Sequence, residues 1–223
     1  MKTARTLLFC ALALASLAAN ARAQTPAQTP PPPRPADGTV NGSTYTNAYF
    51  GLTLTLPAGW VVQGDAAKKE ITEGGKKLMG SKDPTTDAQI DKAIESTLNL
   101  LTAMQYARDA PPPGGFNSGI MCLAEKVPPG SVGVRDEDYM AVLKNTFKFS
   151  QLPITLVKDG YTETVGGETF SVMDLSIDVG GAVVRQRYYA HIRRGYALSF
   201  ILSYQTPEQL AALTEVVKSV RLR

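Results

Sequence analysis

The residues best suited to bind a ligand lie close together in the last third of the chain, between positions 182 and 205. Arginines and tyrosines are interleaved there, and arginine beside an aromatic ring can bind anionic or planar groups. The same pattern arises when aromatic side chains form a core and the arginines are solvated on the opposite face. We take four of these residues as candidates for partner binding: Arg185, Arg187, Tyr189 and His191.

The other chemically active residue types do not indicate catalysis. His191 is the only histidine, which excludes a Ser-His-Asp triad and any metal site built from two histidines. Cys122 lies between Met121 and Leu123, an apolar setting typical of a buried and unreactive thiol. Ser118 is one residue out of place for a Gly-x-Ser-x-Gly nucleophile elbow. We therefore expect that the chain is not an enzyme and that it binds no cofactor.

Acidic residues recur at helical spacing in one segment. Asp87, Asp91 and Glu95 follow one another at intervals of four residues, which places three carboxylates on one side of a predicted helix. Three carboxylates could hold a hard cation such as Ca²⁺. We favour a solvated helix face without a metal, because Lys92 lies among them and no loop supplies further oxygen ligands.

The N-terminus has the order of a secretory signal. Lys2 and Arg5 precede an apolar run over residues 7–19, and Ala21-Arg22-Ala23 follows, so cleavage is expected after Ala23. The apolar run is too short to span a bilayer. Lipid attachment at Cys10 is the alternative, but the bulky Phe9 before it does not suit such a processing site. We expect a periplasmic or secreted protein with no transmembrane segment after cleavage.

Loss of the signal changes the charge of the chain. The precursor has 23 basic and 20 acidic residues, and Lys2, Arg5 and Arg22 leave with the signal, so 20 of each remain. A neutral mature chain offers no electrostatic basis for nucleic-acid binding. Cys122 becomes the only cysteine and cannot form an internal disulfide. A core must therefore hold the fold, as a domain of this size can do, and we expect a monomer.

Residues 24–42 are predicted to be a disordered, Pro-rich linker. Proline removes backbone donors and restricts φ, and this segment has nothing to bury, so it should be an extended tether. A ligand for a proline-binding partner domain is the alternative to a plain spacer. Ordered structure is expected from about Ser43, as a single domain over residues 43–223.

Alternation and turn residues predict the elements of this domain. Apolar residues at every second position from Phe50 to Leu56 indicate a strand, and Pro57–Gly59 turns the chain back into a second strand. Asp136 is expected to cap a helix, and Asp and Glu are favoured in the first turn that follows. Thr206, with Pro207 next and Gln209 three residues on, predicts the start of the last helix. Strands are predicted over 50–56, 60–62, 98–106, 119–125, 154–157 and 168–178, and helices over 65–80, from Asp83-Pro84, from Asp136 and from Thr206.

The stretch 182–205 is predicted to be a central β-hairpin whose register has two alternatives. A two-residue turn at Arg194-Gly195 pairs Arg193 with Tyr196 and places the four candidate residues on one face with Leu198. A three-residue loop would pair Ile192 with Tyr196 and leave the arginines on the other face. We favour the two-residue turn, because Gly195 readily adopts positive φ and helices on both sides of the sheet would not require a wholly apolar face.

The opening strands resemble those of a known group. Tyr45-x-Asn47-x-x-Phe50-Gly51-Leu52 and then Pro57-x-Gly59-Trp60 are similar to the first hairpin of secreted bacterial domains in the PsbP/DcrB-like superfamily, which includes the PsbP proteins of photosystem II. The resemblance extends from about Tyr45 to Leu222, including a terminal helix that ends at 219–222. It implies an α+β fold, an antiparallel sheet flanked by helices as an α/β/α sandwich. It implies no established activity for most bacterial members. Some relatives bind larger assemblies or metal ions, through residues that have no matched positions here.

Two classes of function follow from these observations. The favoured one is a non-catalytic, exported PsbP-like module that binds a protein partner or an envelope assembly. The alternative is a carrier of a small ligand or metal, or an enzyme with a site made of carboxylates and tyrosines. A polar cleft containing titratable groups with shifted pKa values would favour the alternative.

Overall fold

Strict alternation of side chains builds the first layer of the fold. Phe50, Leu52, Leu54 and Leu56 are all buried and Thr55 between them is exposed, as the sequence predicts. In the computed structural model, the described residues are 32–79, 84–107, 109–110, 115–128, 130–131, 133–148 and 152–223, and all of them except Pro32 belong to one compact unit, Pro33–Arg223. The signal segment, residues 24–31 of the Pro-rich linker and Asp83 lie outside the described residues.

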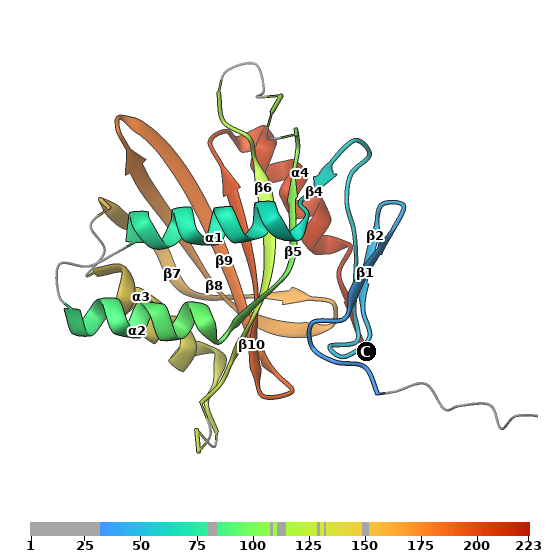
Figure 1. The fold of residues 1–223 in the computed structure, drawn as a ribbon, viewed down its shortest axis with the longest axis horizontal. Helices are drawn as coiled ribbons and strands as arrows, with labels where there is room; N and C mark the ends of the chain where they lie inside the picture. Colours follow the sequence, from blue (N-terminus) through green and yellow to red (C-terminus); the bar gives the residue numbers. More distant parts are fainter. Residues whose placement is uncertain are drawn as a thin grey trace, which may run out of the picture. The chain divides into compact units, whose positions relative to one another are not determined.

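The described residues of this unit form two antiparallel sheets and four helices (Figure 1). The small sheet has the order β1 (Gly38–Asn41), β2 (Thr44–Asn47), β3 (Leu52–Thr55), β11 (Arg221–Leu222). The large sheet has the order β4 (Val61–Val62), β5 (Thr97–Met104), β6 (Gly119–Lys126), β10 (Tyr196–Tyr204), β9 (Ala182–Arg193), β8 (Glu168–Val179), β7 (Ile154–Val165). The helices are α1 (Asp65–Met79), α2 (Pro84–Glu95), α3 (Asp136–Lys148) and α4 (Pro207–Lys218). The predicted α+β class is confirmed, with two sheets in place of the single one expected.

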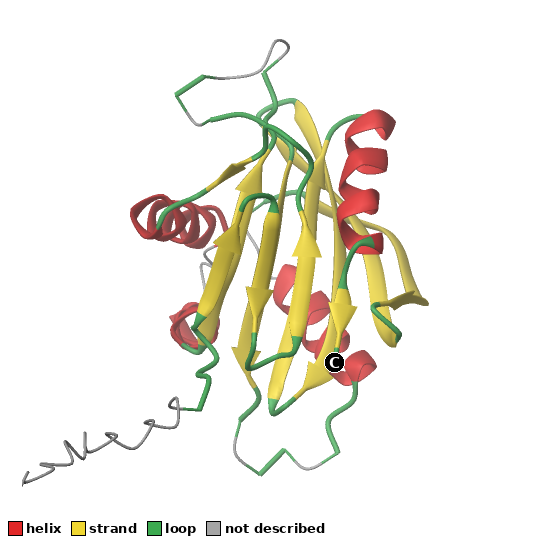
Figure 2. Cartoon of the chain, turned by 90° about the vertical axis from the view of Figure 1, so that its right-hand side faces the viewer, coloured by secondary structure: helices red, strands yellow, loops and turns green. Residues whose placement is uncertain are grey.

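The large sheet has a separate core on each face. The first core joins one face to the small sheet and to α4, and it contains Phe50, Phe200 and Leu213. The second core lies between the opposite face and α3, and it contains Met140, Met173 and Tyr188. Figures 1 and 2 show α1 and α2 on one side of the large sheet and α4 on the other. Helices therefore cover both faces, as the sequence predicts.

The last helix begins as predicted and ends earlier. Thr206 and Gln209 form a reciprocal capping box, with each side chain bonded to the backbone of the other. The helix was expected to continue to Leu222, but it ends at Lys218, and Ser219 bonds the backbone of Thr55. The chain then forms β11, which pairs with β3. The expectation was wrong because the free edge of β3 offers the last residues a ladder of backbone hydrogen bonds that a longer helix would forgo.

The predicted pairing of the opening hairpin was also wrong. Residues 60–62 were expected to return against 50–56, but β3 already has β2 on one edge and β11 on the other. The chain instead crosses to the large sheet, where Val61 pairs with Met104. Trp60, half-buried at this crossing, packs against the first core.

Two exposed strands are longer or earlier than predicted. Ordered structure starts before Ser43, because β1 pairs with β2 although its side chains are mostly exposed. The strand predicted over 154–157 extends to Val165 as β7, on the outer edge of the large sheet. Neither segment has the apolar alternation that reveals a half-buried strand, so the sequence pattern did not predict their full extent.

The β9–β10 hairpin has the predicted two-residue turn. Arg193 pairs with Tyr196, and His191 lies opposite Leu198. Arg194 and Gly195 have φ values of 52° and 77°, the left-handed conformation at both central positions that a type I′ turn requires. The prediction of register is therefore confirmed.

Candidate functional site

The four candidate residues share one face of β9. Pairing with β10 places Arg185, Arg187, Tyr189 and His191 on the same side as Leu198 and Phe200, which belong to the first core. The intervening Tyr188 and Ala190 point into the second core. Helix α4 packs against β10 on the candidate side. The predicted register therefore placed the four candidates on the face of the large sheet that the structure shows. Whether their side chains are free to bind a partner depends on their hydrogen bonds within the chain.

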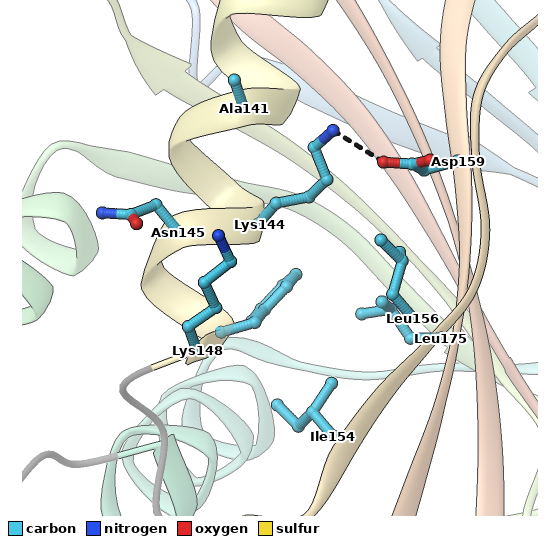
Figure 3. Close-up of a pocket in the computed structure, with 9 residues that line it drawn as sticks. Ala141, Lys144, Asn145, Lys148, Ile154, Leu156, Asp159 and Leu175 are labelled. Carbon is cyan, nitrogen blue, oxygen red and sulfur yellow. Dashed lines mark hydrogen bonds and ion pairs between the residues drawn. The ribbon is translucent and has the colours of Figure 1, made fainter.

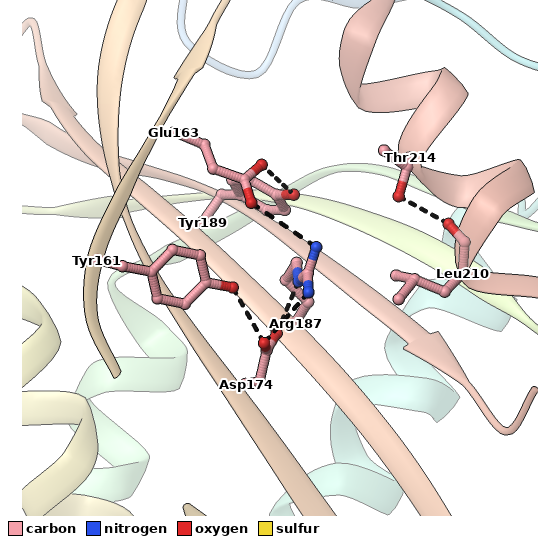
Figure 4. Close-up of polar contacts among 7 residues, drawn as sticks. All are labelled: Tyr161, Glu163, Asp174, Arg187, Tyr189, Leu210 and Thr214. Atoms are coloured by element: carbon pink, nitrogen blue, oxygen red, sulfur yellow. Dashed lines mark hydrogen bonds and ion pairs between the residues drawn. The ribbon is translucent and has the colours of Figure 1, made fainter. Parts of the chain in front are cut away.

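Arg187 forms a two-pronged ion pair with Asp174 of the neighbouring strand β8. Nε of Arg187 lies 2.6 Å from Oδ1 of Asp174, and Nη2 lies 3.2 Å from Oδ2. The hydroxyl of Tyr161 on β7 donates to Oδ2 of the same carboxylate at 3.0 Å (Figure 4). Only 12% of the Asp174 side chain and 20% of the Arg187 side chain are exposed. Three strands are therefore joined by one carboxylate, in the geometry that makes arginine–carboxylate pairs strong.

A second carboxylate faces the same guanidinium from β7. Nη1 of Arg187 lies 3.7 Å from Glu163, and Tyr189 donates its hydroxyl proton to Glu163 at 2.9 Å (Figure 4). Tyr189 is completely buried. We call these five residues the Arg187 network: Tyr161, Glu163, Asp174, Arg187 and Tyr189.

The electrostatics of the Arg187 network keep its donors protonated. Burial is the largest cause that raises the pKa of both Tyr161 and Tyr189 above the usual value for tyrosine. Burial lowers the pKa of Arg187, but hydrogen bonds to Asp174 and Tyr189 and the charge of Asp174 outweigh it, so the net pKa is raised. Both phenols and the guanidinium therefore remain hydrogen-bond donors at neutral pH, and the arrangement suits a fixed network better than proton transfer.

The other two candidates are also bonded within the chain. Nη1 of Arg185, which is exposed, donates to the backbone oxygen of Gln205 at 2.8 Å. Nδ1 of His191 lies 3.0 Å from Oδ2 of Asp136, and its ring centroid is 5.1 Å from that of Phe170. The structure thus brings Arg187 and Tyr189 into one network and gives Arg185 and His191 separate partners.

Asp136 does not cap α3 as expected. Its Oδ1 accepts the backbone N–H of Ile192 at 2.7 Å, so both carboxylate oxygens face β9. At the helix start, the carboxylate of Asp138 instead accepts a backbone hydrogen bond, from the N–H of Arg135 at 3.0 Å. The expectation was wrong because both oxygens of the Asp136 carboxylate are in contact with the end of β9, one with the backbone N–H of Ile192 and the other with Nδ1 of His191.

The arginines at the hairpin turn hold the small sheet. Nε of Arg193 donates to the backbone oxygen of Phe50 at 2.8 Å, and its guanidinium also contacts Glu168 and the backbone oxygen of Arg223. Arg194 donates to the backbone oxygen of Tyr49. These arginines join the two sheets, a structural role that explains their density in the sequence.

The remaining sequence candidates have structural partners. Nζ of Lys76 on α1 lies 2.6 Å from Oδ1 of Asp91 on α2. The hydrogen bond to Asp91 is the largest cause that raises the pKa of this lysine, and the charges of Asp91, Asp87 and Glu95 add to it. Within the described ranges, no group of three or more His, Cys, Asp or Glu side chains could hold a metal ion. Ser118 is buried and donates to Gln105 at 3.0 Å. Cys122 is fully buried, as predicted, and burial raises the pKa of its thiol.

The sequence did not predict a groove between α3 and the first half of β7. Its volume is about 450 Å³, and we call it the α3–β7 groove (Figure 3). Its apolar surface includes Phe147, Leu156 and Leu175, and Lys144, Lys148 and Asp159 supply charge. Nζ of Lys144 lies 2.6 Å from Oδ2 of Asp159. The signal that could have revealed it is the spacing of Lys144 and Lys148, which puts two cations on one helix face beside an apolar strand.

No protein-family model and no curated protein matches this chain. Among solved structures, the cyanobacterial PsbP (CyanoP) of Synechocystis is similar over 83% of this chain and 95% of its own, with 12% identity and a TM-score of 0.47. LpqN of Mycobacterium tuberculosis, described as involved in cell envelope biogenesis, is similar over 77% and 82%, with 13% identity and a TM-score of 0.38.

A third similar structure is the immunity protein TplEi of the Pseudomonas aeruginosa type VI secretion system, solved with the "L" peptide. It matches 83% of this chain and 97% of its own, with 11% identity and a TM-score of 0.37. The chain has an α+β fold of antiparallel sheets with flanking helices, and a PsbP structure is among those to which it is similar.

Proposed function

We propose that this chain is a non-catalytic, exported module that binds a protein partner of the cell envelope. One observation carries the proposal. The groups on β9 that could do chemistry are bonded to partners inside the chain, whereas the α3–β7 groove presents apolar side chains and lysines at the surface. Apolar surface beside a few charged groups is suited to recognition.

Export is part of the proposal and depends on the N-terminal sequence. The charged, apolar and small-residue order of residues 1–23 supports secretion to the periplasm or medium. No helix among the described residues is long and apolar enough to cross a membrane. The mature protein should start at Gln24, which mass spectrometry of the exported chain measures directly.

The four candidate residues on β9 remain a proposed second contact surface. Arg185 is exposed and could exchange the Gln205 oxygen for a partner's acidic group. Arg187 and Tyr189 could do so only by leaving carboxylates in the sheet without their present donors, which costs free energy. We therefore place the main partner contact at the α3–β7 groove.

The Arg187 network favours one alternative function. It brings two carboxylates and two tyrosines together around one guanidinium, the composition expected of a carboxylate/Tyr site that binds or transforms a small polar ligand. The raised pKa values of both tyrosines argue against their acting as bases at neutral pH. A Tyr161→Phe, Tyr189→Phe variant that loses binding of a small anion while keeping its fold would support this alternative.

Affinity capture from an envelope extract tests the binding function. The mature chain is tagged at Gln24 and compared with a variant lacking residues 24–32, which keeps β1, and with Arg185→Ala, Arg187→Ala. We expect the mature chain to capture a specific protein, identified by mass spectrometry and confirmed by reciprocal capture. Retention of that protein by the shortened variant assigns binding to the folded unit. Recovery of nothing beyond a tag-only control contradicts the proposal.

A further inference from the structure

We propose that the α3–β7 groove is the docking site for a short segment of a partner protein that carries acidic and aliphatic side chains together. This inference rests on the proposed function and specifies the chemistry of its partner. An aliphatic side chain enters between α3 and β7, and a neighbouring carboxylate pairs with Lys148.

The groove has an apolar floor that the fold leaves partly open. Leu175 and Phe147 are buried beneath it, but Leu156 is 43% exposed. Leu156 pairs with Leu175, so both side chains lie on the face of the sheet that α3 covers. Figure 3 shows Leu156 and Leu175 side by side across the groove from the lysines of α3. An aliphatic side chain placed here would bury surface that is now in water.

The charge of the groove favours an anionic group. Lys144 and Lys148 lie one turn apart on α3, where like charges repel, and Asp159 lies within ion-pair distance of Lys144. Lys148 is exposed at the C-terminal end of the helix, and no described acidic residue lies within ion-pair distance of it. Asp159 offsets the charge of Lys144, and a partner's carboxylate would do the same for Lys148.

The shape of β7 determines how the segment is held. β7 is the edge strand of the large sheet, and its pairing with β8 shifts register between Leu156 and Lys158 and again between Lys158 and Tyr161. Such bulges interrupt the regular ladder of donors and acceptors that strand addition needs. The partner segment is therefore held by its side chains rather than as an added strand.

The open groove also distinguishes a protein segment from a lipid. Leu156, which lines the groove on β7, is 43% exposed, so this side of the groove is open to solvent. An acyl chain in this groove would leave much of its length in water, whereas a polypeptide can cover the exposed side chains with its own backbone and neighbours. The observations therefore favour a peptide over an amphiphilic lipid.

Fluorescence anisotropy with labelled octapeptides tests the proposal on the full mature protein. The probe is Gly-Ser-Glu-Leu-Leu-Glu-Ser-Gly, compared with peptides in which both Glu are Gln or both Leu are Ser. We expect the acidic, aliphatic peptide to bind most tightly and to weaken as salt rises. Lys148→Glu and Leu156→Ser should each weaken binding about fivefold or more.

Matched variants control for general effects. Lys218→Glu changes a lysine in the last turn of α4, and Val142→Ser changes an exposed residue of α3 that does not line the groove. Both should bind the peptide within about twofold of the parent. Equal binding of all three peptides, or binding that Lys148→Glu leaves unchanged, overturns the proposal. Displacement of the peptide by palmitate or by phosphatidylglycerol vesicles, with tighter binding than any peptide, would also overturn it in favour of a lipid.

Affinity capture separates this proposal from the proposed function. If Lys148→Glu captures the envelope partner as well as the parent does, the groove is not the docking site and the proposed function stands. If the parent captures no partner while peptide binding depends on Lys148, the docking chemistry stands and the envelope function fails.

Discussion

The carboxylate of Asp136 lies 3.0 Å from Nδ1 of His191, which joins the first turn of α3 to the end of β9 across 55 residues of sequence. Its other oxygen accepts the backbone N–H of Ile192 at 2.7 Å. The Asp136 side chain is 18% exposed and that of His191 is 19% exposed, so water screens this contact only in part. The contact positions α3, and with it the α3–β7 groove, relative to the large sheet.

Removal of this link should destabilise the fold. We expect Asp136→Ala to lower the free energy of unfolding by about 1–3 kcal/mol, because the Ile192 N–H loses its acceptor in a part-buried site. Glu137→Ala is the matched control, since Glu137 is a neighbouring, exposed acid whose partner is Arg135. Its change should stay within about 1 kcal/mol. Urea unfolding of both variants measures the difference, and equal stability of the two would contradict the assigned role of Asp136.

The ion pair between Arg187 and Asp174 should show strong coupling. Asp174→Ala leaves the guanidinium without its two-pronged partner in a site where only 20% of the arginine side chain is exposed. We expect a loss of about 3 kcal/mol or more. Asp174→Leu with Arg187→Met should cost less than the sum of the two single changes, because neither charge is then left alone.

A double-mutant cycle by chemical unfolding measures this coupling. Asp178→Ala is a control on the same strand, since Asp178 is exposed near the β8–β9 turn and its carboxylate accepts the Gly181 N–H. Its loss should stay near about 1 kcal/mol. Additive costs for the Asp174 and Arg187 changes would show that the ion pair does not hold the three strands together.

Elements with local signals were predictable from the sequence. The start of α4 follows from Thr206 and Gln209, whose side chains satisfy the backbone of the same turn. The β9–β10 register follows from Gly195, because positive φ in a two-residue turn fixes which residues are opposite each other. Each of these features is determined by residues within a few positions of one another.

Elements that depend on distant partners were not predictable. β11 pairs with the edge of β3 that β2 leaves free. Because both edges of β3 are then occupied, β4 pairs with β5 in the large sheet instead. Alternation in the hairpin predicted which face of the sheet carries Arg187. Its partners Asp174 and Glu163 depend on how β7, β8 and β9 pair, and the pairing of β7 with β8 contains register shifts that the sequence does not reveal. Lys144 and Lys148 look like a solvated helix face until β7 is seen beside them.

The buried face of α4 supports a prediction about stability. Leu213 is fully buried in the first core, where α4 meets the large and small sheets. Leu213→Ala should cost about 2–5 kcal/mol through lost burial and the cavity left behind. Lys218→Ala, at an exposed position on the same helix, should change stability by less than about 1 kcal/mol. Thermal melts compare the two, and an unchanged melting temperature for Leu213→Ala would remove this residue from the core.

Glu125 near the end of β6 should give the fold a measurable pH dependence. Burial raises the pKa of its carboxyl above the ordinary 4.5, and the hydrogen bond from Tyr139, 2.8 Å long, opposes that shift only in part. The folded state therefore holds this proton more tightly than the unfolded state. Its contribution to stability is fully present below about pH 4.5 and is lost as the pH rises through the raised pKa of the folded state.

Glu125→Gln isolates this contribution because glutamine keeps the shape and cannot ionise. We expect the variant to gain stability relative to the parent between pH 4 and pH 7, since the parent alone must ionise a part-buried group over that interval. Glu137→Gln, which changes an exposed acid in the first turn of α3, is the control and should run parallel to the parent. Urea unfolding at several pH values gives the difference curve. A difference between Glu125→Gln and the parent that does not change with pH would show that Glu125 titrates alike in the folded and unfolded chains.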